Sequence, residues 1–218
     1  MTQFFTNPAI IAEMIALVAA TLAFFRLKDG YWGLFIPYMF IVLAVETSGY
    51  LFRINKLPNY ILYNGLLALQ LVFFTYLFTK FFDPEKFRRS LLIAGGVFII
   101  MFLAESTSLG FASYNRISRL AFSWYIVFWS LLFYFELLRN DRIFAPIRYA
   151  PFWTITGLFF FYFGTAVMFS FQDVVSKIKL TGNISFYTLV MSCLSCILYG
   201  CWIIGFICQK IPTPSSTR

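Results

Sequence analysis

The sequence predicts an all-α integral membrane protein: a bundle of seven transmembrane helices with short loops, the N-terminus outside and the C-terminus cytoplasmic. Three observations predict it, namely the composition, seven long apolar runs and an uneven distribution of Lys and Arg. Of the 218 residues, 61% are hydrophobic and 12% are charged, whereas soluble domains carry about 25% charged residues. A chain of this size leaves much of its surface exposed, so the surrounding solvent must be lipid.

The apolar runs have roughly the 17–25 residues that a helix needs to cross about 30 Å of hydrocarbon. They are too long and continuous for barrel strands, which alternate over about 10 residues. We expect spans at residues 8–25, 31–53, 60–82, 90–111, 115–138, 151–172 and 184–208. Turn and charge clusters separate them, and residues 1–218 form a single transmembrane domain.

The first span is expected to be part of the mature chain. Its flank "MTQFFTN" carries no positive charge, and no small-residue cleavage site follows the apolar run, so it does not match a signal peptide. The second span contains Pro37 and the fourth contains Gly95 and Gly96, which are the candidate flex points of the bundle.

All four cysteines lie in the last span, where Cys193 and Cys196 form a CxxC pair. Such a pair suggests redox or metal chemistry, but the chain has no His, and a lipid-embedded Cys behaves as a small hydrophobe. Ser192, Cys196 and Gly200 instead form a small-residue row that favours close helix packing. We therefore expect no metal site and no cofactor.

The orientation follows from the cationic residues. The loops after the first, third and fifth spans and the C-terminus hold 11 of the 17 Lys and Arg, and the opposite side holds 6. Positive residues gather on the cytoplasmic side, which places the N-terminus outside and the C-terminus in the cytoplasm. We expect the membrane to be a plasma or inner membrane. Anionic headgroups account for the net charge of +8, so no nucleic-acid partner is expected.

Three acids lie inside the predicted spans: Glu13, Glu46 and Glu105. Each is about five to seven residues from the outer end of its helix, or about 8–10 Å deep at roughly 1.5 Å per residue. A charge inside a membrane helix costs about 2.5–3.5 kcal/mol at mid-depth. These acids should therefore face the bundle interior at a common level.

Other polar residues fall near the same level on neighbouring spans. The predicted site is an outward-opening pocket for a small molecule, lipid or protons, lined by Glu13, Glu46, Tyr50, Tyr63, Asn64, Gln70, Glu105, Arg116, Arg119 and Trp124. A structural alternative remains open, because polar groups also hold membrane helices together. Glu46 with Arg116, or Glu105 with Arg119, would then be buried pairs.

No catalytic constellation is found, since without His the usual zinc and Ser-His or Cys-His arrangements lack their parts. We expect no enzyme. The favoured hypothesis is a receptor or sensor that signals through a separate partner on the basic cytoplasmic face. The alternatives are a small-solute or proton-coupled transporter or substrate-binding membrane subunit, favoured by intramembrane acids, and an assembly protein or homo-oligomer that uses small residues such as Gly157 and Gly164.

Overall fold

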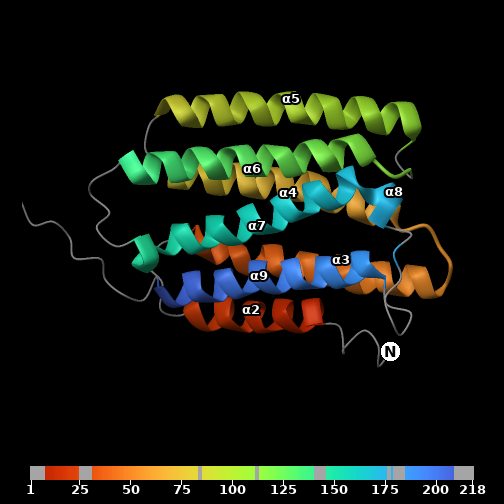
Figure 1. Ribbon diagram of the computed structural model, residues 1–218, viewed down its shortest axis with the longest axis horizontal. Coiled ribbons are helices and arrows are strands. Elements are labelled where there is room, and N and C mark those ends of the chain that lie inside the picture. The colour runs from red at the N-terminus through yellow and green to blue at the C-terminus, as the bar shows by residue number, and fades with distance from the viewer. Residues whose placement is uncertain are drawn as a thin grey trace, which may run out of the picture.

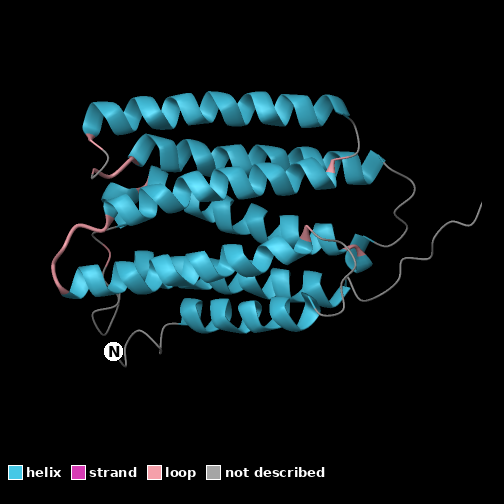
Figure 2. Cartoon of the chain, turned by 180° about the vertical axis from the view of Figure 1, so that it is seen from behind, coloured by secondary structure: helices cyan, strands magenta, loops and turns pink. Residues whose placement is uncertain are grey.

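The computed structural model describes residues 8–24, 31–82, 85–110, 113–139, 146–175, 178 and 185–208. Within these residues the chain is helical and contains no β-strand (Figure 2). The helices are α2 (Pro8–Phe24), η1 (Trp32–Leu34), α3 (Phe35–Ile54), α4 (Tyr60–Phe81), α5 (Glu85–Leu109), α6 (Arg116–Arg139), η2 (Pro146–Arg148), α7 (Ala150–Ser170), α8 (Gln172–Val175) and α9 (Phe186–Cys208).

The long helices α2 to α7 and α9 lie side by side (Figure 1), and their pairwise contacts close them into a ring. Neighbours in sequence pack on one another, and α2 packs on both α3 and α9, so the first and last helices are adjacent. The closest pairings are α7 with α9, α2 with α9 and α6 with α7. Helix α5 is the outermost element and packs mainly on α4 and α6.

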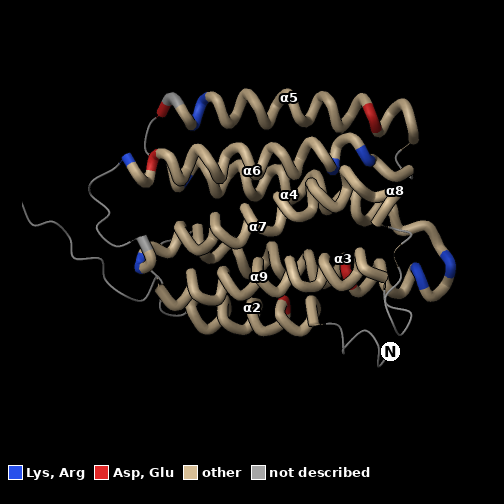
Figure 3. The backbone as a smooth tube through the Cα atoms, in the orientation of Figure 1, with Lys and Arg blue, Asp and Glu red and all other residues tan. Residues whose placement is uncertain are grey.

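Among the described residues, six helices are long and apolar enough to cross a membrane, and α2 is a shorter apolar helix of 17 residues. Large apolar side chains point outward, for example Ile93, Ile100 and Leu138. Lys and Arg gather at the helix ends, while Glu13, Glu46 and Glu105 lie within helices (Figure 3). This pattern is that of a multi-pass membrane protein, as the sequence predicts.

Small residues set the closest helix contacts. A Cβ added at Gly157 would lie 3.0 Å from the Leu198 carbonyl oxygen, and one at Gly164 would lie 2.6 Å from a Leu194 methyl group. These two glycines therefore pack α7 against α9 within one chain. In the row of Ser192, Cys196 and Gly200, the Cys196 Sγ lies 3.7 Å from the Pro8 carbonyl oxygen of α2, whereas a Cβ at Gly200 would meet nothing within 4 Å.

The candidate flex points leave their helices unbroken. Pro37 is the third residue of α3. Residues in the first turn of a helix make no N–H hydrogen bond within it, so the missing N–H of proline costs no hydrogen bond there. Gly95 packs against Thr75 and Tyr125, and Gly96 faces open space, both within the continuous helix α5. Helix α5 itself ends at Gly110, whose φ of 86° is the left-handed conformation typical of a helix C-terminus.

Candidate functional site

A cavity of about 400 Å³ lies inside the bundle, at the end where α3 and α7 finish and α4, α6 and α9 begin. We call this the Arg53 end. Six of the seven long helices contribute to the cavity, and α5 does not. Arg53 and Thr188, which line it, are exposed, so the cavity reaches the surface at this end. Its volume falls in the range of small-molecule sites, about 300–1,000 Å³.

Four of the residues predicted for the site line this cavity: Glu46, Tyr63, Gln70 and Arg119. Helix geometry brings them together, because Tyr63 and Gln70 are seven residues apart and so share a face of α4. The Tyr63 phenol lies within electrostatic reach of Glu46, Arg53 and Arg119. A Cβ at Gly49 would lie 2.6 Å from the Tyr63 hydroxyl, so the glycine on α3 makes the space that this phenol occupies.

Arg119 is the cation on the α6 side of the cavity. Its Nη2 donates to Asn64 Oδ1 at 3.3 Å, and its guanidinium lies 5.9 Å from the Tyr63 ring centre and 5.1 Å from that of Tyr114. Its Nε is buried and has no hydrogen-bond partner among the described residues. Asn64 in turn donates to the Ser113 carbonyl at 2.8 Å, which fixes the amide. Arg119 is thus held by an amide and aromatic rings.

Tyr114 lies in the turn between α5 and α6, outside the spans. Burial raises the pKa of its phenol, while Arg119 and Arg116 act in the opposite direction. The shift is away from neutral pH, so Tyr114 stays a neutral hydroxyl beside the guanidinium.

Glu46 is the acid of the cavity, and its electrostatic partner is Arg53, seven residues later on the same helix face. Within the described residues its carboxylate makes no hydrogen bond. Arg53 is exposed and lies 5.9 Å from the centre of the Tyr50 ring. The polar part of the cavity therefore combines one carboxylate with two guanidinium groups.

Glu13 does not line the cavity, but it lies close enough to Glu46 to interact electrostatically with it. It is 3% exposed, one carboxylate oxygen interacts with the Tyr199 hydroxyl, and Oε1 has no partner among the described residues. The Tyr38 hydroxyl interacts with the side chain of Gln70, which lines the cavity. A buried polar cluster thus continues from the cavity into the bundle.

The third acid, Glu105, lies apart from the other two and caps a helix. Its carboxylate accepts hydrogen bonds from the backbone N–H groups of Ile117, at 3.0 Å, and Ser118, at 2.7 Å, and from the Ser118 hydroxyl. These N–H groups belong to the first turn of α6, where helices lack internal partners and attract negative charge. Of the three acids expected around one pocket, Glu46 lines the cavity, Glu13 lies in the buried cluster beside it, and Glu105 lies apart because α5 is outside the cavity.

The remaining predicted residues lie around the site rather than in it. Asn64 supports Arg119, as described above, whereas Arg116 and Trp124 are exposed and Tyr50 lies beside Arg53. None of these four lines the cavity.

The sequence interpretation missed several lining residues on α7 and α9. The polar ones are Tyr162, Thr165, Tyr187, Thr188, Ser192 and Ser195. Tyr162 is buried in the middle of α7. Its mid-span position could have identified it as a site residue from the sequence, because a tyrosine of the interfacial belt would lie at a helix end.

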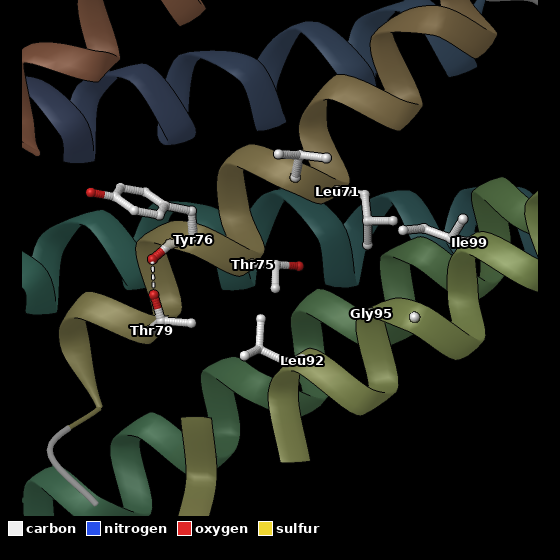
Figure 4. Close-up of a pocket in the computed structure, with 9 residues that line it drawn as sticks. Leu71, Thr75, Tyr76, Thr79, Leu92, Gly95 and Ile99 are labelled. Atoms are coloured by element: carbon white, nitrogen blue, oxygen red, sulfur yellow. Dashed lines mark hydrogen bonds between the residues drawn. The ribbon is translucent and has the colours of Figure 1, made fainter. Parts of the chain in front are cut away.

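A second cavity, of about 340 Å³, lies between α4 and α5 (Figure 4). Its walls include Leu71, Thr75, Leu92, Gly95 and Ile99, and the Thr79 hydroxyl beside it donates to the Tyr76 carbonyl at 2.6 Å. Leu92 and Ile99 are exposed on the outer surface. This is a lipid-facing crevice with few free polar groups, and it offers little to orient a polar ligand.

In the described part of the chain, no group of three or more His, Cys, Asp or Glu residues is arranged to hold a metal ion. Fold and cavity define the class: a multi-pass helical membrane protein with a polar cavity inside one end of its bundle. No protein-family model matches this chain, and no curated protein or solved structure is significantly similar to it.

Proposed function

We propose that this protein is a membrane receptor or sensor that binds a small molecule in the cavity at the Arg53 end. In the proposed orientation this end faces the exterior, and the opposite, more basic end contacts a separate signalling partner. The observation that carries the proposal is the cavity itself, with Glu46 and Arg119 in its wall. Charged side chains inside a membrane bundle are costly and typically serve a ligand, an ion pathway or a structural pair.

The position of the cavity supports a sensor. It touches α2, α3, α4, α6, α7 and α9, so a ligand there contacts most of the helices whose opposite ends form the basic face. A ligand shifts a conformational equilibrium only by its difference in affinity between two arrangements. Contacts with many helices provide that difference, whereas a ligand on one helix would not sense their relative positions.

The proposal is tested by screening small molecules for an increase in the unfolding temperature of the purified chain in nanodiscs. We expect stabilising compounds to lose their effect in Thr165→Phe, which places a ring in the cavity, and to keep it in Thr107→Phe. Thr107 is exposed on α5, away from the cavity. Compounds that stabilise both variants equally would place binding elsewhere and contradict the proposal.

Transport is the second candidate, and the Glu13–Glu46–Tyr199 cluster favours it because buried acids commonly relay protons. Vesicles distinguish the two functions. A transporter accumulates a radiolabelled hit or moves protons, and Glu46→Gln or Glu13→Gln abolishes this movement. A sensor binds the hit without flux. In a sensor, binding of the hit also changes the distance between spin labels placed at Lys80 and Arg139 after the native cysteines have been replaced.

A further inference from the structure

The unusual feature of the cavity is an uncompensated arginine. Arg119 is partly buried, yet the described side chains that act on it electrostatically are tyrosines: Tyr114, Tyr187, Tyr63 and Tyr162. Aromatic faces attract a guanidinium, but they leave its N–H donors unused. Among the described residues only one of these donors has an acceptor, at the long distance of 3.3 Å, and Nε has none.

Neither acid near this arginine serves as its counter-charge. The sequence predicted Glu105 as a possible partner, but its carboxylate accepts hydrogen bonds from backbone N–H groups of α6. Glu46 interacts with Arg53 at the cavity mouth. The charged side chains that line the cavity are thus two arginines and one glutamate, which leaves one positive charge on the α6 side.

The rest of the wall is suited to an apolar body. Phe122 follows Arg119 by one turn of α6, and Leu66, Phe161, Phe169 and Met191 line the same cavity. Ser123 and Thr165 also line it, but their hydroxyls donate to the Arg119 and Phe161 carbonyls. Arginine binds planar carboxylates through paired hydrogen bonds.

We propose that the Arg119 side of the cavity binds the anionic group of the ligand, and that the ligand is a carboxylate on an apolar body. This assignment rests on the proposed binding function and specifies its chemistry. Two sources carry such a group: a water-soluble acid that enters at the Arg53 end, and a fatty acid from the bilayer. Both place the carboxylate on Arg119 and the apolar body against Phe122 and Phe161.

The experiment compares acids with their neutral amides on the full chain in phosphatidylcholine nanodiscs. Benzoate and benzamide represent the soluble source, and decanoate and decanamide represent the bilayer source. Binding is measured by displacement of a spin-labelled carboxylate and by the unfolding temperature. We expect at least one acid to bind ten-fold or more tightly than its amide, and the better acid of the two identifies the source.

The variants locate the effect. Arg119→Gln should remove the preference for acid over amide, and Arg119→Lys, which keeps the charge but not the planar fork, should retain part of it. Arg116→Gln, on the same helix but exposed and outside the cavity, should keep the full preference.

Each contrary outcome has a distinct meaning. Equal binding of acid and amide, lost in Thr165→Phe, overturns the anion subsite and leaves the cavity function intact. A preference that survives Arg119→Gln assigns the anion to another group and also overturns the proposal. Binding of no acid up to its solubility limit overturns the carboxylate assignment in the wild type, independently of whether any variant folds.

Discussion

Asn115 occupies the N-cap position of α6, where an Asn side chain ordinarily accepts a hydrogen bond from the helix's own N–H groups. Here its amide instead donates to the Ser106 hydroxyl at 2.5 Å, and Glu105 of the preceding helix accepts from the N–H groups of Ile117 and Ser118. The turn between α5 and α6 is thus closed by reciprocal contacts between the two helices. An acid that appears functional in the sequence is, in the structure, a capping residue.

This arrangement predicts a stability effect at one residue. Glu105→Ala leaves the buried N–H of Ser118 and the part-buried N–H of Ile117 without this acceptor, so we expect a loss of about 2 kcal/mol in the free energy of unfolding. The measurement is thermal or denaturant unfolding in detergent. Glu85→Ala is the control, because Glu85 and Arg89 form an exposed ion pair at 2.7 Å, which contributes about 0–1 kcal/mol. A stable Glu105→Ala variant that loses ligand binding would instead assign Glu105 to the site.

At the scale of the elements, the glycines distinguish helix contacts from open helix faces. Gly157 of α7 faces the backbone of α9, with an added Cβ 3.0 Å from the Leu198 carbonyl oxygen and 3.3 Å from its Cα. Backbone atoms in a helix cannot move aside singly. At Gly49 the obstacle is the end of the Tyr63 side chain, which can rotate away.

The surroundings of Gly157 and Gly200 predict opposite results when each is changed to Ala. Gly157→Ala should force α7 from α9 and lower the stability by about 1–3 kcal/mol. Gly200→Ala, in open space on α9, should be neutral or stabilise by up to about 1 kcal/mol, since Ala favours a helix over Gly. Both are measured by unfolding in the same detergent. Equal effects at the two positions would show that helix propensity, rather than close packing, decides them.

At the scale of the whole molecule, polar groups of five helices meet at one end because the ring brings the ends of α3 and α7 against the starts of α4, α6 and α9. The function depends on which side of the membrane this end faces. Because Lys and Arg are in excess on the other side, we expect this end to face the exterior.

The orientation can be tested directly in cells. After replacement of the native cysteines, we expect Lys56→Cys, in the α3–α4 turn, to react with a membrane-impermeant maleimide in intact cells. Arg139→Cys, at the far end of α6, should react only after permeabilisation. The reverse pattern would turn the cavity toward the cytoplasm and make the ligand an intracellular one.

Much of the fold was predictable because lipid restricts the backbone so strongly. The runs expected at 60–82 and 115–138 appear as α4 (Tyr60–Phe81) and α6 (Arg116–Arg139), since a chain in hydrocarbon must satisfy its hydrogen bonds within each segment. The α5 helix begins earlier than expected, at Glu85 rather than residue 90. Its charged first turn is compatible with a helix that extends beyond the apolar core.

By itself the sequence determined the membrane environment, the helices and the presence of costly polar groups inside them, because these follow from composition and from the length of each run. Only the tertiary structure decided which polar groups meet. Helix rotation and neighbour choice turn Glu46, Tyr63 and Arg119 into one cavity and direct Glu105 to the start of α6. Those choices depend on side-chain packing between helices, such as Gly157 against Leu198, which no single segment encodes.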